Sequence, residues 1–149
     1  MNSGSGNDLV FDRALAAATG VRERAYAPYS GFHVGAAVVT ATGQVFVGAN
    51  VENASYGLTV CAERVAIWTG TAAGCSDFRL VVVVTDTPRP VTPCGACRQV
   101  LAELAPQARV VMATLGGLCQ EATVPELLPG AFGPEDIIPV TGQRPPRSP

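Results

Sequence analysis

The chain has 149 residues, a formal net charge of −2 and a pI of about 5.3. This length supports one domain with a real core, and an acidic balance without basic clusters argues against a nucleic-acid-binding footprint. Only 15% of the residues are charged and 48% are hydrophobic, so we expect a well-buried domain with some apolar surface that meets another subunit. The longest apolar run, Leu80 to Val84, is far too short to span a bilayer.

The beginning of the chain has no basic start followed by an apolar run, so the sequence predicts no signal peptide. The chain has five cysteines, two of them in a Cys-x-x-Cys pattern. Without a secretion signal, this pattern indicates metal or redox chemistry and not a disulfide framework. The expected compartment is therefore the reducing cytoplasm.

The first part of the chain predicts a helix followed by a β-hairpin. Residues 1–7 are rich in Gly, Ser and Asn and are expected to form a loose tail. Asp8 is a candidate N-cap for a helix that runs to about Tyr26, because apolar residues recur there at three- or four-residue spacing. Strands are expected at Phe32 to Thr40 and at Gln44 to Ala49, since their short connection is typical of a hairpin.

The second part alternates helices with strands. Helices are expected at Val60 to Ala73 and at Cys94 to Ala105. The near-continuous apolar run Phe78 to Thr85 indicates a central strand that is buried on both faces. Two further strands, Arg109 to Thr114 and Cys119 to Val124, are joined by a turn too short for a crossover helix, which predicts an antiparallel pair.

Short helical turns are expected at Pro125 to Leu128 and at Pro134 to Asp136, ahead of a proline-rich tail at 144–149 that is expected to be disordered. The order of the elements predicts a single α/β domain over 1–149, a three-layer α/β/α sandwich around a five-stranded mixed sheet. In this arrangement both cysteine-bearing helices begin at strand ends, where ligands gather in open α/β sheets.

Three cysteines are the candidates for the chemistry of this chain. Cys61, Cys94 and Cys97 could bind Zn²⁺ as thiolates. Three protein ligands leave a tetrahedral ion one open position, as in a catalytic site. All three lie at predicted helix N-termini, whose partial positive charge and N–H groups stabilise thiolates.

A closed structural zinc site is the alternative for these cysteines, and it needs a fourth protein ligand. His33, Cys75 and Cys119 are the candidates of the usual type. His33 alternates with apolar neighbours on a predicted strand and fits a surface histidine better than a ligand. Cys75 and Cys119 are most simply small hydrophobic residues in or near the core.

Glu63 stands two residues after Cys61, close to the metal without having to bind it. This position suits a proton shuttle for a zinc-activated water. Arg64 could donate hydrogen bonds to the ligating sulfurs and so withdraw negative charge from a site with three thiolates. The plain alternatives are a first-turn helix acid for Glu63 and surface positions for Arg64 and Arg98.

Six blocks of sequence extend this pattern over roughly Tyr26 to Asp136, and together they resemble the cytidine deaminase family in its small, zinc-dependent, homotetrameric form. Cys-x-Glu with Pro-Cys-x-x-Cys marks only the wider superfamily of zinc deaminases, whose glutamate is not a ligand. The Phe-x-Val-Gly-Ala-Ala and Asn-Val-Glu-Asn blocks add specificity for free pyrimidine nucleosides. The blocks are Ala27-Pro28-Tyr29-Ser30, Phe32-x-Val34-Gly35-Ala36-Ala37, Asn50-Val51-Glu52-Asn53-Ala54-Ser55-Tyr56-Gly57, Cys61-Ala62-Glu63-Arg64, Pro93-Cys94-Gly95-Ala96-Cys97-Arg98-Gln99 and Glu126-Leu127-Leu128-Pro129-Gly130-Ala131-Phe132.

The resemblance implies roles for further residues. Asn50 and Glu52 would hold the ribose 3′-hydroxyl, and Phe32 would stack on the pyrimidine. The backbone around Ala62 and the Glu63 carboxylate would read the base. Phe132 would lie over the substrate of a neighbouring subunit in a homotetramer with shared active sites.

The implied activity is hydrolytic deamination of cytidine and 2′-deoxycytidine to uridine and 2′-deoxyuridine plus ammonia, in pyrimidine salvage. The enzyme would be a hydrolase that acts on the C–N bond of a cyclic amidine and carries one Zn²⁺ per subunit. An enzyme of the same superfamily acting on a nucleoside antibiotic such as blasticidin S is the second hypothesis. A zinc-stabilised nucleic-acid-binding module is the third, and the acidic pI counts against it.

Overall fold

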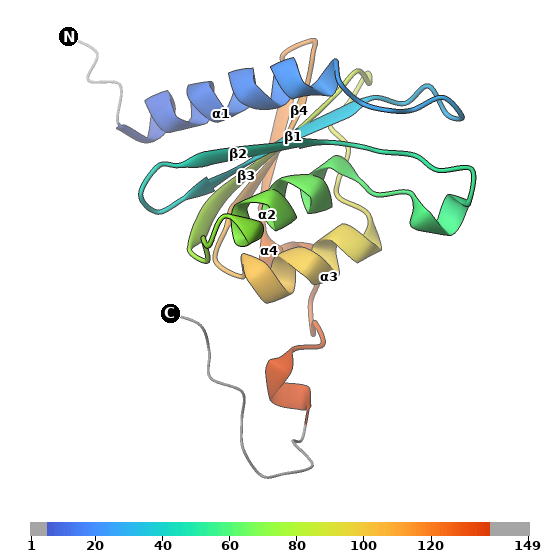
Figure 1. Cartoon of the computed structure of the whole chain (residues 1–149). Coiled ribbons are helices and arrows are strands. Elements are labelled where there is room, and N and C mark those ends of the chain that lie inside the picture. The colour runs from blue at the N-terminus through green and yellow to red at the C-terminus, as the bar shows by residue number, and fades with distance from the viewer. Residues whose placement is uncertain (1–5, 138–149) are drawn as a thin grey trace, which may run out of the picture.

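The computed structural model describes residues 6–137, which form a five-stranded mixed sheet with helices on both faces (Figure 1). The strand order is β2-β1-β3-β4-β5, in which β3 and β4 are parallel and the other neighbours are antiparallel. The predicted α/β/α sandwich is therefore confirmed. The elements are α1 (Gly6–Arg22), β1 (Val34–Thr40), β2 (Val45–Ala49), a 3₁₀ turn (Tyr56–Leu58), α2 (Ala62–Ala72), β3 (Phe78–Thr85), α3 (Gly95–Leu104), β4 (Arg109–Thr114), β5 (Cys119–Thr123), α4 (Val124–Leu127) and a second 3₁₀ turn (Pro134–Asp136).

The centre of the sheet is the most apolar part of the fold. Every residue of β1 is buried, and in β3 only Arg79 is exposed. Such strands are covered on both faces, as the apolar run over Phe78–Thr85 predicts. The edge strand β5 differs, because nearly all its residues are exposed.

Two glycines set how closely the helices approach the sheet. A Cβ on Gly35 of β1 would lie 2.0 Å from the carbonyl oxygen of Ala18 in α1. A Cβ on Gly48 of β2 would lie 2.3 Å from the amide nitrogen of Ala66 in α2. Both distances are far inside van der Waals contact, so only glycine permits this packing. The glycine of the Phe-x-Val-Gly-Ala-Ala block therefore has a packing role.

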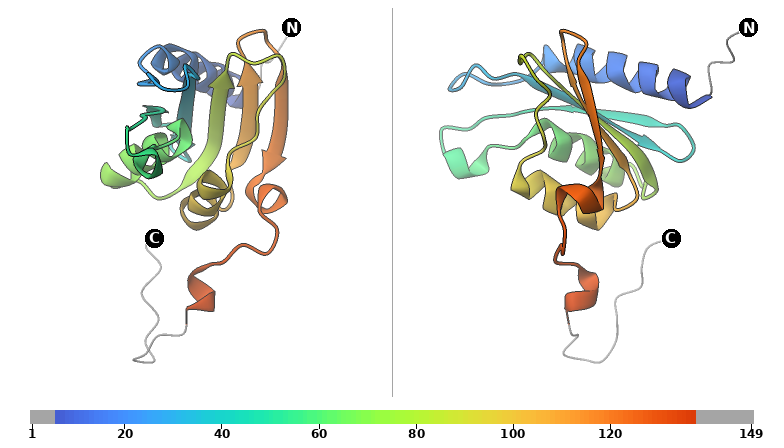
Figure 2. Two further views of the ribbon diagram at one scale, coloured as in Figure 1. Left: turned by 90° about the vertical axis from the view of Figure 1, so that its right-hand side faces the viewer. Right: turned by 180° about the vertical axis from the view of Figure 1, so that it is seen from behind.

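The helices form two layers. Figure 2 shows α1 on one face of the sheet and α2 with α3 on the other. The chain enters both α2 and α3 from the same end, at the right of Figure 1, so their N-termini are neighbours. This arrangement brings together two segments that are far apart in the sequence.

The first helix differs from the prediction at both ends. It begins at Gly6, so residues 6 and 7 are helical and not a tail, and Asp8 lies in the first turn and is not the N-cap. It ends at Arg22 because Tyr26 is already held in extended pairing: its N–H donates to Asn50 O, and its carbonyl oxygen accepts from Glu52 N–H. Residues 1–5 and the proline-rich tail at 144–149 lie outside the described residues.

Other boundaries shift by a residue or two. The strand predicted from Phe32 begins at Val34, and Cys61 and Cys94 are N-caps just before their helices. Shifts of this size are common at element ends. The antiparallel turn between β4 and β5 and the helical turn at Pro134–Asp136 are confirmed.

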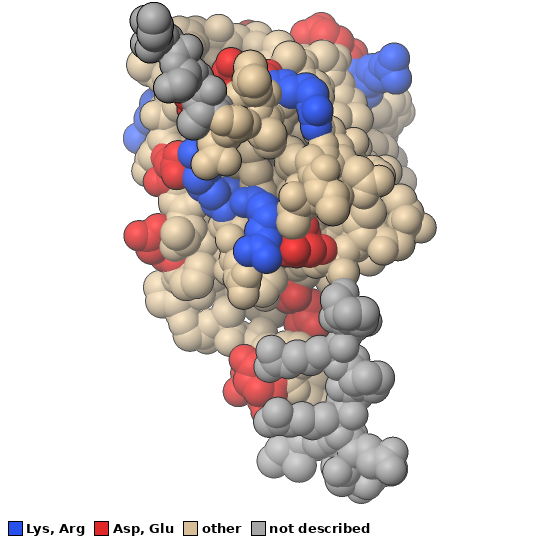
Figure 3. All heavy atoms as spheres, turned by 90° about the vertical axis from the view of Figure 1, so that its left-hand side faces the viewer, with Lys and Arg blue, Asp and Glu red and all other residues tan. Residues whose placement is uncertain are grey.

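Charge is interspersed on the surface. On the face shown in Figure 3, arginine side chains lie next to acidic ones. Arg79 pairs with Asp77 at 2.6 Å, and Arg109 pairs with Glu121 at 3.1 Å. This face therefore lacks the continuous basic track that a nucleic-acid backbone requires. Within residues 6–137, none of the helices combines the length and apolar character needed to cross a membrane.

Candidate metal centre and active site

The first half of the site is the start of α2. Cys61 is the N-cap, and no side chain caps this helix by a hydrogen bond. Ala62 and Glu63 follow in the first turn, and both are buried. The free N–H groups of an uncapped helix start carry partial positive charge, which stabilises a thiolate at this position.

The second half is the start of α3. Cys94 is the N-cap, again without a side-chain hydrogen bond, and Cys97 lies in the first turn. Pro93, just before the cap, is fully buried and anchors the loop that leads into the helix. Two uncapped helix N-termini thus meet at one point.

The three sulfurs converge there. The Sγ atoms of Cys61, Cys94 and Cys97 all lie within 4.8 Å of one another, and those of Cys61 and Cys94 are 3.7 Å apart. Cys97 is buried and Cys94 is exposed, so the cluster opens on one side to solvent. No fourth histidine, cysteine or carboxylate within residues 6–137 joins the group. This donor set suits a Zn²⁺ site with an open position.

The candidate fourth ligands lie elsewhere. Cys75 is half-buried against the core and its thiol donates to Gln44 Oε1, while His33 is half-buried at the start of β1. Cys119 is exposed on β5, so the expectation that it lies in or near the core is wrong. The reason is that β5 is an edge strand whose residues are left largely uncovered.

Proton chemistry within the cluster favours metal binding. A hydrogen bond from the Cys97 thiol lowers the pKa of Cys61 to about 5, and the same bond raises the pKa of Cys97. The Cys61 thiolate is therefore available at neutral pH, and a metal would displace the proton of Cys97.

Arg64 faces the same sulfurs. Its Nη2 donates to Cys61 Sγ at 3.6 Å, and its Cζ lies 5.9 Å from the ring centroid of Trp68. Its Nε is buried without a hydrogen-bond partner. A cation held in this way offsets negative charge at the cluster, and the unpaired Nε fits a site that gains a negative group.

Glu63 has the environment of a general acid–base residue. The residue is only 5% exposed, and burial raises the pKa of its carboxyl group to about 7. A carboxyl group that titrates near neutral pH both accepts and donates a proton readily. Sequence spacing predicts a carboxylate close to the metal ligands, and the structure gives it this buried setting.

Asn50 holds the backbone where β1 begins. Its side-chain amide donates to Phe32 O at 2.7 Å and accepts from Val34 N–H at 2.8 Å. One of its two amide N–H groups is used by these bonds, so the other remains to donate. Sequence alone does not predict that Asn50 holds this backbone, because the bonds depend on the pairing of β1 with β2.

Glu52 likewise binds nearby backbone groups and keeps one hydrogen-bonding site free. Its carboxylate accepts from the N–H groups of Tyr29 (2.9 Å) and Ser30 (3.2 Å) and from the Ser30 hydroxyl. The hydrogen bond from the Ser30 hydroxyl is the main reason that its pKa lies below the ordinary value. A carboxylate has about four lone-pair sites, so one remains to accept.

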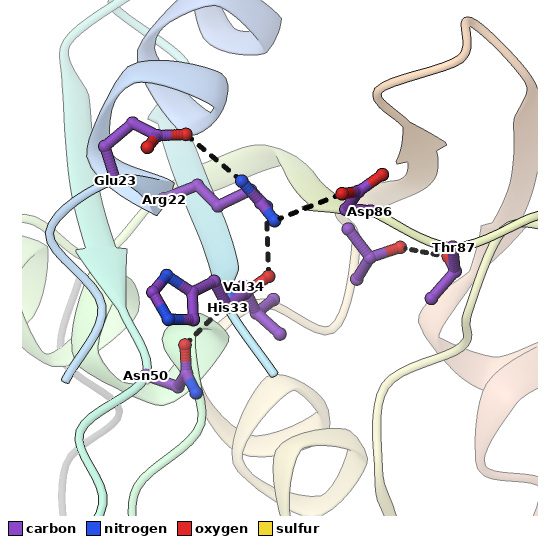
Figure 4. Close-up of polar contacts among 8 residues, drawn as sticks. Arg22, Glu23, His33, Val34, Asn50, Asp86 and Thr87 are labelled. Carbon is purple, nitrogen blue, oxygen red and sulfur yellow. Dashed lines mark hydrogen bonds and ion pairs between the residues drawn. The ribbon is translucent and has the colours of Figure 1, made fainter. Parts of the chain in front are cut away.

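A side chain from α1 also holds the stretch of backbone that Asn50 binds. Arg22, at the end of α1, donates through Nε to His33 O at 3.1 Å and lies 3.8 Å from the carboxylate of Asp86 after β3. Figure 4 shows this arginine above His33 and Asn50 below it at Val34. The backbone next to Phe32 is therefore held by Arg22 of α1 and by Asn50, which follows β2.

The predicted aromatic residues Phe32 and Phe132, here called the aromatic rim, are both open to solvent. Phe32 is 41% exposed and Phe132 is 60% exposed, so neither belongs to the core. Tyr29 and Tyr56 are also exposed and pack edge to face, with ring centroids 5.8 Å apart. The carbonyl oxygen of Phe132 accepts from Gln99 Nε2 at 2.8 Å.

Comparison with known proteins accounts for this arrangement. A family model described as the cytidine and deoxycytidylate deaminase zinc-binding region matches residues 11–114. The chain is 57% identical to a cytidine deaminase of Halalkalibacterium halodurans over 117 residues, which cover 78% of this chain and 89% of that protein. It is 46% identical to a cytidine deaminase of Sporosarcina psychrophila over 127 residues, covering 85% of this chain and 93% of the relative.

Solved structures similar to this chain are also cytidine deaminases. The crystal structure of cytidine deaminase from Burkholderia pseudomallei matches with a TM-score of 0.79 and 50% sequence identity, over 81% of this chain and 98% of that one. The family model spans the cysteine cluster, and the relatives are similar over most of their own length. The chain therefore belongs to the cytidine and deoxycytidylate deaminase family.

Proposed function

We propose that this chain is a zinc-dependent hydrolase that converts cytidine and 2′-deoxycytidine to uridine and 2′-deoxyuridine, with release of ammonia. The observation that carries the proposal is the buried Glu63 carboxyl group, whose pKa is raised to about 7, in the first turn of the helix that Cys61 begins. The resemblance to cytidine deaminases of similar length supports this substrate class.

Cys61, Cys94 and Cys97 would hold one Zn²⁺ per chain. When bound, the ion supplies Lewis acidity that makes water a nucleophile near neutral pH. The arginine beside the cluster, Arg64, offsets the negative charge of three thiolates, which would otherwise weaken that acidity.

Glu63 moves the protons of the reaction. Its carboxylate takes a proton from the attacking water and delivers it to N3 of the pyrimidine, which makes C4 electrophilic. The oxygen of water adds to C4, and Glu63 passes the second water proton to the amino group, which leaves as ammonia. Cytidine and water thus become uridine and ammonia, and Glu63 returns to its initial state.

The groups left over at Asn50 and Glu52 match a sugar hydroxyl. Asn50 retains one amide N–H and Glu52 retains one acceptor site. A hydroxyl group accepts from the first and donates to the second, so the pair would hold the ribose 3′-hydroxyl. Phe32 would stack on the base, and the backbone at Ala62 would contact its polar edge.

The assembly is part of the proposal. Phe132 lies on a C-terminal segment that leaves the body of the fold after α4 (Figure 2). We expect a homotetramer in which Phe132 covers the substrate of a neighbouring subunit. The chain would act as a single domain, in pyrimidine salvage in the cytoplasm, with small nucleosides and not with nucleic acid or membrane.

An ultraviolet assay with matched substrates tests this function. Purified protein with measured zinc content is incubated with cytidine, 2′-deoxycytidine and blasticidin S, and the products are separated. We expect uridine and ammonia in equal amounts, and turnover lower by about 10²–10⁴-fold in Glu63→Gln protein that retains zinc. Turnover of blasticidin S alone would replace the proposal with the antibiotic deaminase, and zinc-free protein with full activity would refute it.

A further inference from the structure

Arg98, the residue after the third cysteine, makes three hydrogen bonds. Its Nε donates to Pro93 O at 2.7 Å, its Nη1 to Leu127 O at 2.7 Å, and its Nη2 to Thr92 Oγ1 at 2.9 Å. Each nitrogen of the guanidinium group therefore has a partner. This arginine is not a freely solvated surface residue, which was one interpretation of the sequence.

The acceptors belong to two different parts of the chain. Thr92 and Pro93 form the end of the loop that places Cys94, and the Pro93 side chain is fully buried. Leu127 is the last residue of α4, and the segment that carries Phe132 begins just after it. One guanidinium group thus bridges the metal loop and the base of the C-terminal segment.

A second bond runs alongside this bridge. Gln99, the next residue of α3, donates through Nε2 to Phe132 O at 2.8 Å. This bond holds the far end of the segment, at Phe132. The hydrogen bonds of Arg98 reach both the loop before Cys94 and the base of the segment.

Arg79 offers a comparison within the same chain. It also makes three hydrogen bonds, two to Asp77 and one to Gln107. All of its partners are exposed side chains, whereas two of the three partners of Arg98 are backbone carbonyl groups. Backbone acceptors fix the path of the chain, and exposed ion pairs of the Arg79 type contribute little to stability.

We propose that Arg98 is a positioning residue that couples the zinc site to the C-terminal segment, so that zinc binding and the ordering of residues 128–133 support each other. The inference rests on the proposed zinc site but not on the identity of the substrate. Coupling of this kind is reciprocal: zinc steadies the segment by the same factor by which the segment steadies zinc.

The planar guanidinium group is what makes the coupling possible. It presents several N–H groups in fixed directions, so movement of one acceptor is transmitted to the others. In Arg98→Ala protein the carbonyl groups of Pro93 and Leu127 lose this common partner. In Arg98→Lys protein one flexible ammonium group cannot serve all three acceptors at once.

Two measurements on the full chain test the coupling. The first is the rate at which zinc passes to a chelator. The second is hydrogen exchange of the amides in 128–133, measured with and without bound zinc. The variants are Arg98→Ala, Arg98→Lys, Gln99→Ala and, as a matched control, Arg79→Ala.

We expect Arg98→Ala to release zinc about tenfold faster, because partners just outside a metal's ligands typically change affinity by about 10–100-fold. Zinc should slow exchange in 128–133 in the unaltered chain and in Arg79→Ala, and this zinc dependence should disappear in Arg98→Ala. Arg98→Lys should fall between them. Gln99→Ala should raise exchange in the segment, but that exchange should still respond to zinc, because the bonds of Arg98 to Pro93 and Leu127 are intact.

The proposal is overturned if zinc leaves Arg98→Ala at the unaltered rate, or if exchange in 128–133 responds to zinc equally in both proteins. Should Arg98→Ala fail to fold, Arg98→Lys carries the same test, and unchanged values in that variant count against the coupling. Neither readout uses a nucleoside. Absence of cytidine turnover would thus remove the proposed function while leaving this coupling to be judged on its own.

Discussion

The reacting centre and the aromatic rim are built in opposite ways. Cys97 is fully buried and Glu63 is 5% exposed, whereas Phe132 is 60% exposed. The centre has its sulfurs, its carboxyl group and its arginine within one chain. The rim exposes large apolar rings to solvent without a covering layer. Under the proposed function, one chain would supply the chemical step, and enclosure of the substrate would depend on a second chain.

The two regions also stand on different supports. The centre is formed by the first turns of α2 and α3, and Gly48 allows α2 to pack directly on the sheet. The rim comes from loops and from the segment after α4. Sites on rigid helices hold atoms more accurately than sites on loops do. We therefore expect substitutions in the centre to change turnover and those in the rim to change substrate binding.

The largest effect is expected for Glu63→Gln, which removes the proton carrier and keeps the shape. Turnover should fall by about 10²–10⁴-fold, the usual contribution of a positioned acid–base residue, while zinc content and melting temperature stay close to those of the unaltered chain. Steady-state kinetics with metal analysis measures this. Turnover within a few-fold of normal would show that Glu63 does not carry protons in the reaction, and it would contradict the distinction between the two regions.

A smaller loss is expected for Arg64→Gln, which removes the cation next to Cys61 Sγ. Zinc affinity or turnover should fall by about 10–100-fold, because such partners tune the metal without binding it. The chain has a single tryptophan, Trp68, beside Arg64, so its fluorescence reports the same event. Unchanged zinc retention and an unchanged pH–rate profile would show that Arg64 only packs against the helix.

The rim should respond differently. Phe132→Ala is expected to raise KM by about tenfold with a much smaller change in kcat, since an aromatic contact contributes about 0.5–1.5 kcal/mol beyond its buried area. The chain should fold and retain zinc, because Phe132 is outside the core. A fall in kcat with KM unchanged would place this residue in the reacting centre instead.

The smallest effect concerns acid stability at Glu52. Its folded pKa lies below the ordinary value of 4.5, chiefly because of the Ser30 hydroxyl, so its ionised form stabilises the fold above that pH. This contribution is lost as the pH falls through the folded pKa. Glu52→Gln should therefore be less stable than the unaltered chain at neutral pH, and the difference should shrink in acid.

Glu126 provides the control for that experiment. Its pKa is also lowered, first by the backbone N–H of Thr123, but it caps α4 away from the cysteine cluster. Chemical denaturation at several pH values should show the same trend for Glu126→Gln, whereas only Glu52→Gln should also raise KM for cytidine. Equal KM values in both variants would contradict the sugar-binding role of Glu52.

Sequence patterns predicted the fold in nearly every element. The spacing of apolar residues, the apolar runs and the lengths of turns are local signals. They predicted β3 and β4 with their observed bounds. The convergence of Cys61 with Cys94 followed from placing both at helix starts. The end of α1 was not predictable from local signals, because pairing of Tyr26 with distant Asn50 and Glu52 ends the helix early.

The supports of the site were the hardest part to predict. Arg98 looks the same in sequence whether it is solvated or bonded to Pro93 and Leu127, because these acceptors meet only in the folded chain. The burial of Glu52 likewise depends on the turn at Tyr29 and Ser30. Long-range hydrogen bonds of this kind leave no local pattern.

Subunit mixing tests the division between centre and rim most directly. Glu63→Ala and Phe132→Ala chains are dissociated, combined in equal amounts and reassembled. Cytidine turnover, measured at a substrate concentration well below KM, is compared with that of each parent treated alone. If Phe132 closes the site of a neighbour, about a quarter of the mixed sites receive an intact Glu63 with an intact neighbouring Phe132, and activity rises well above the average of the parents. Verified mixed oligomers whose activity equals that average would contradict the account, because Phe132 would then act only within its own chain.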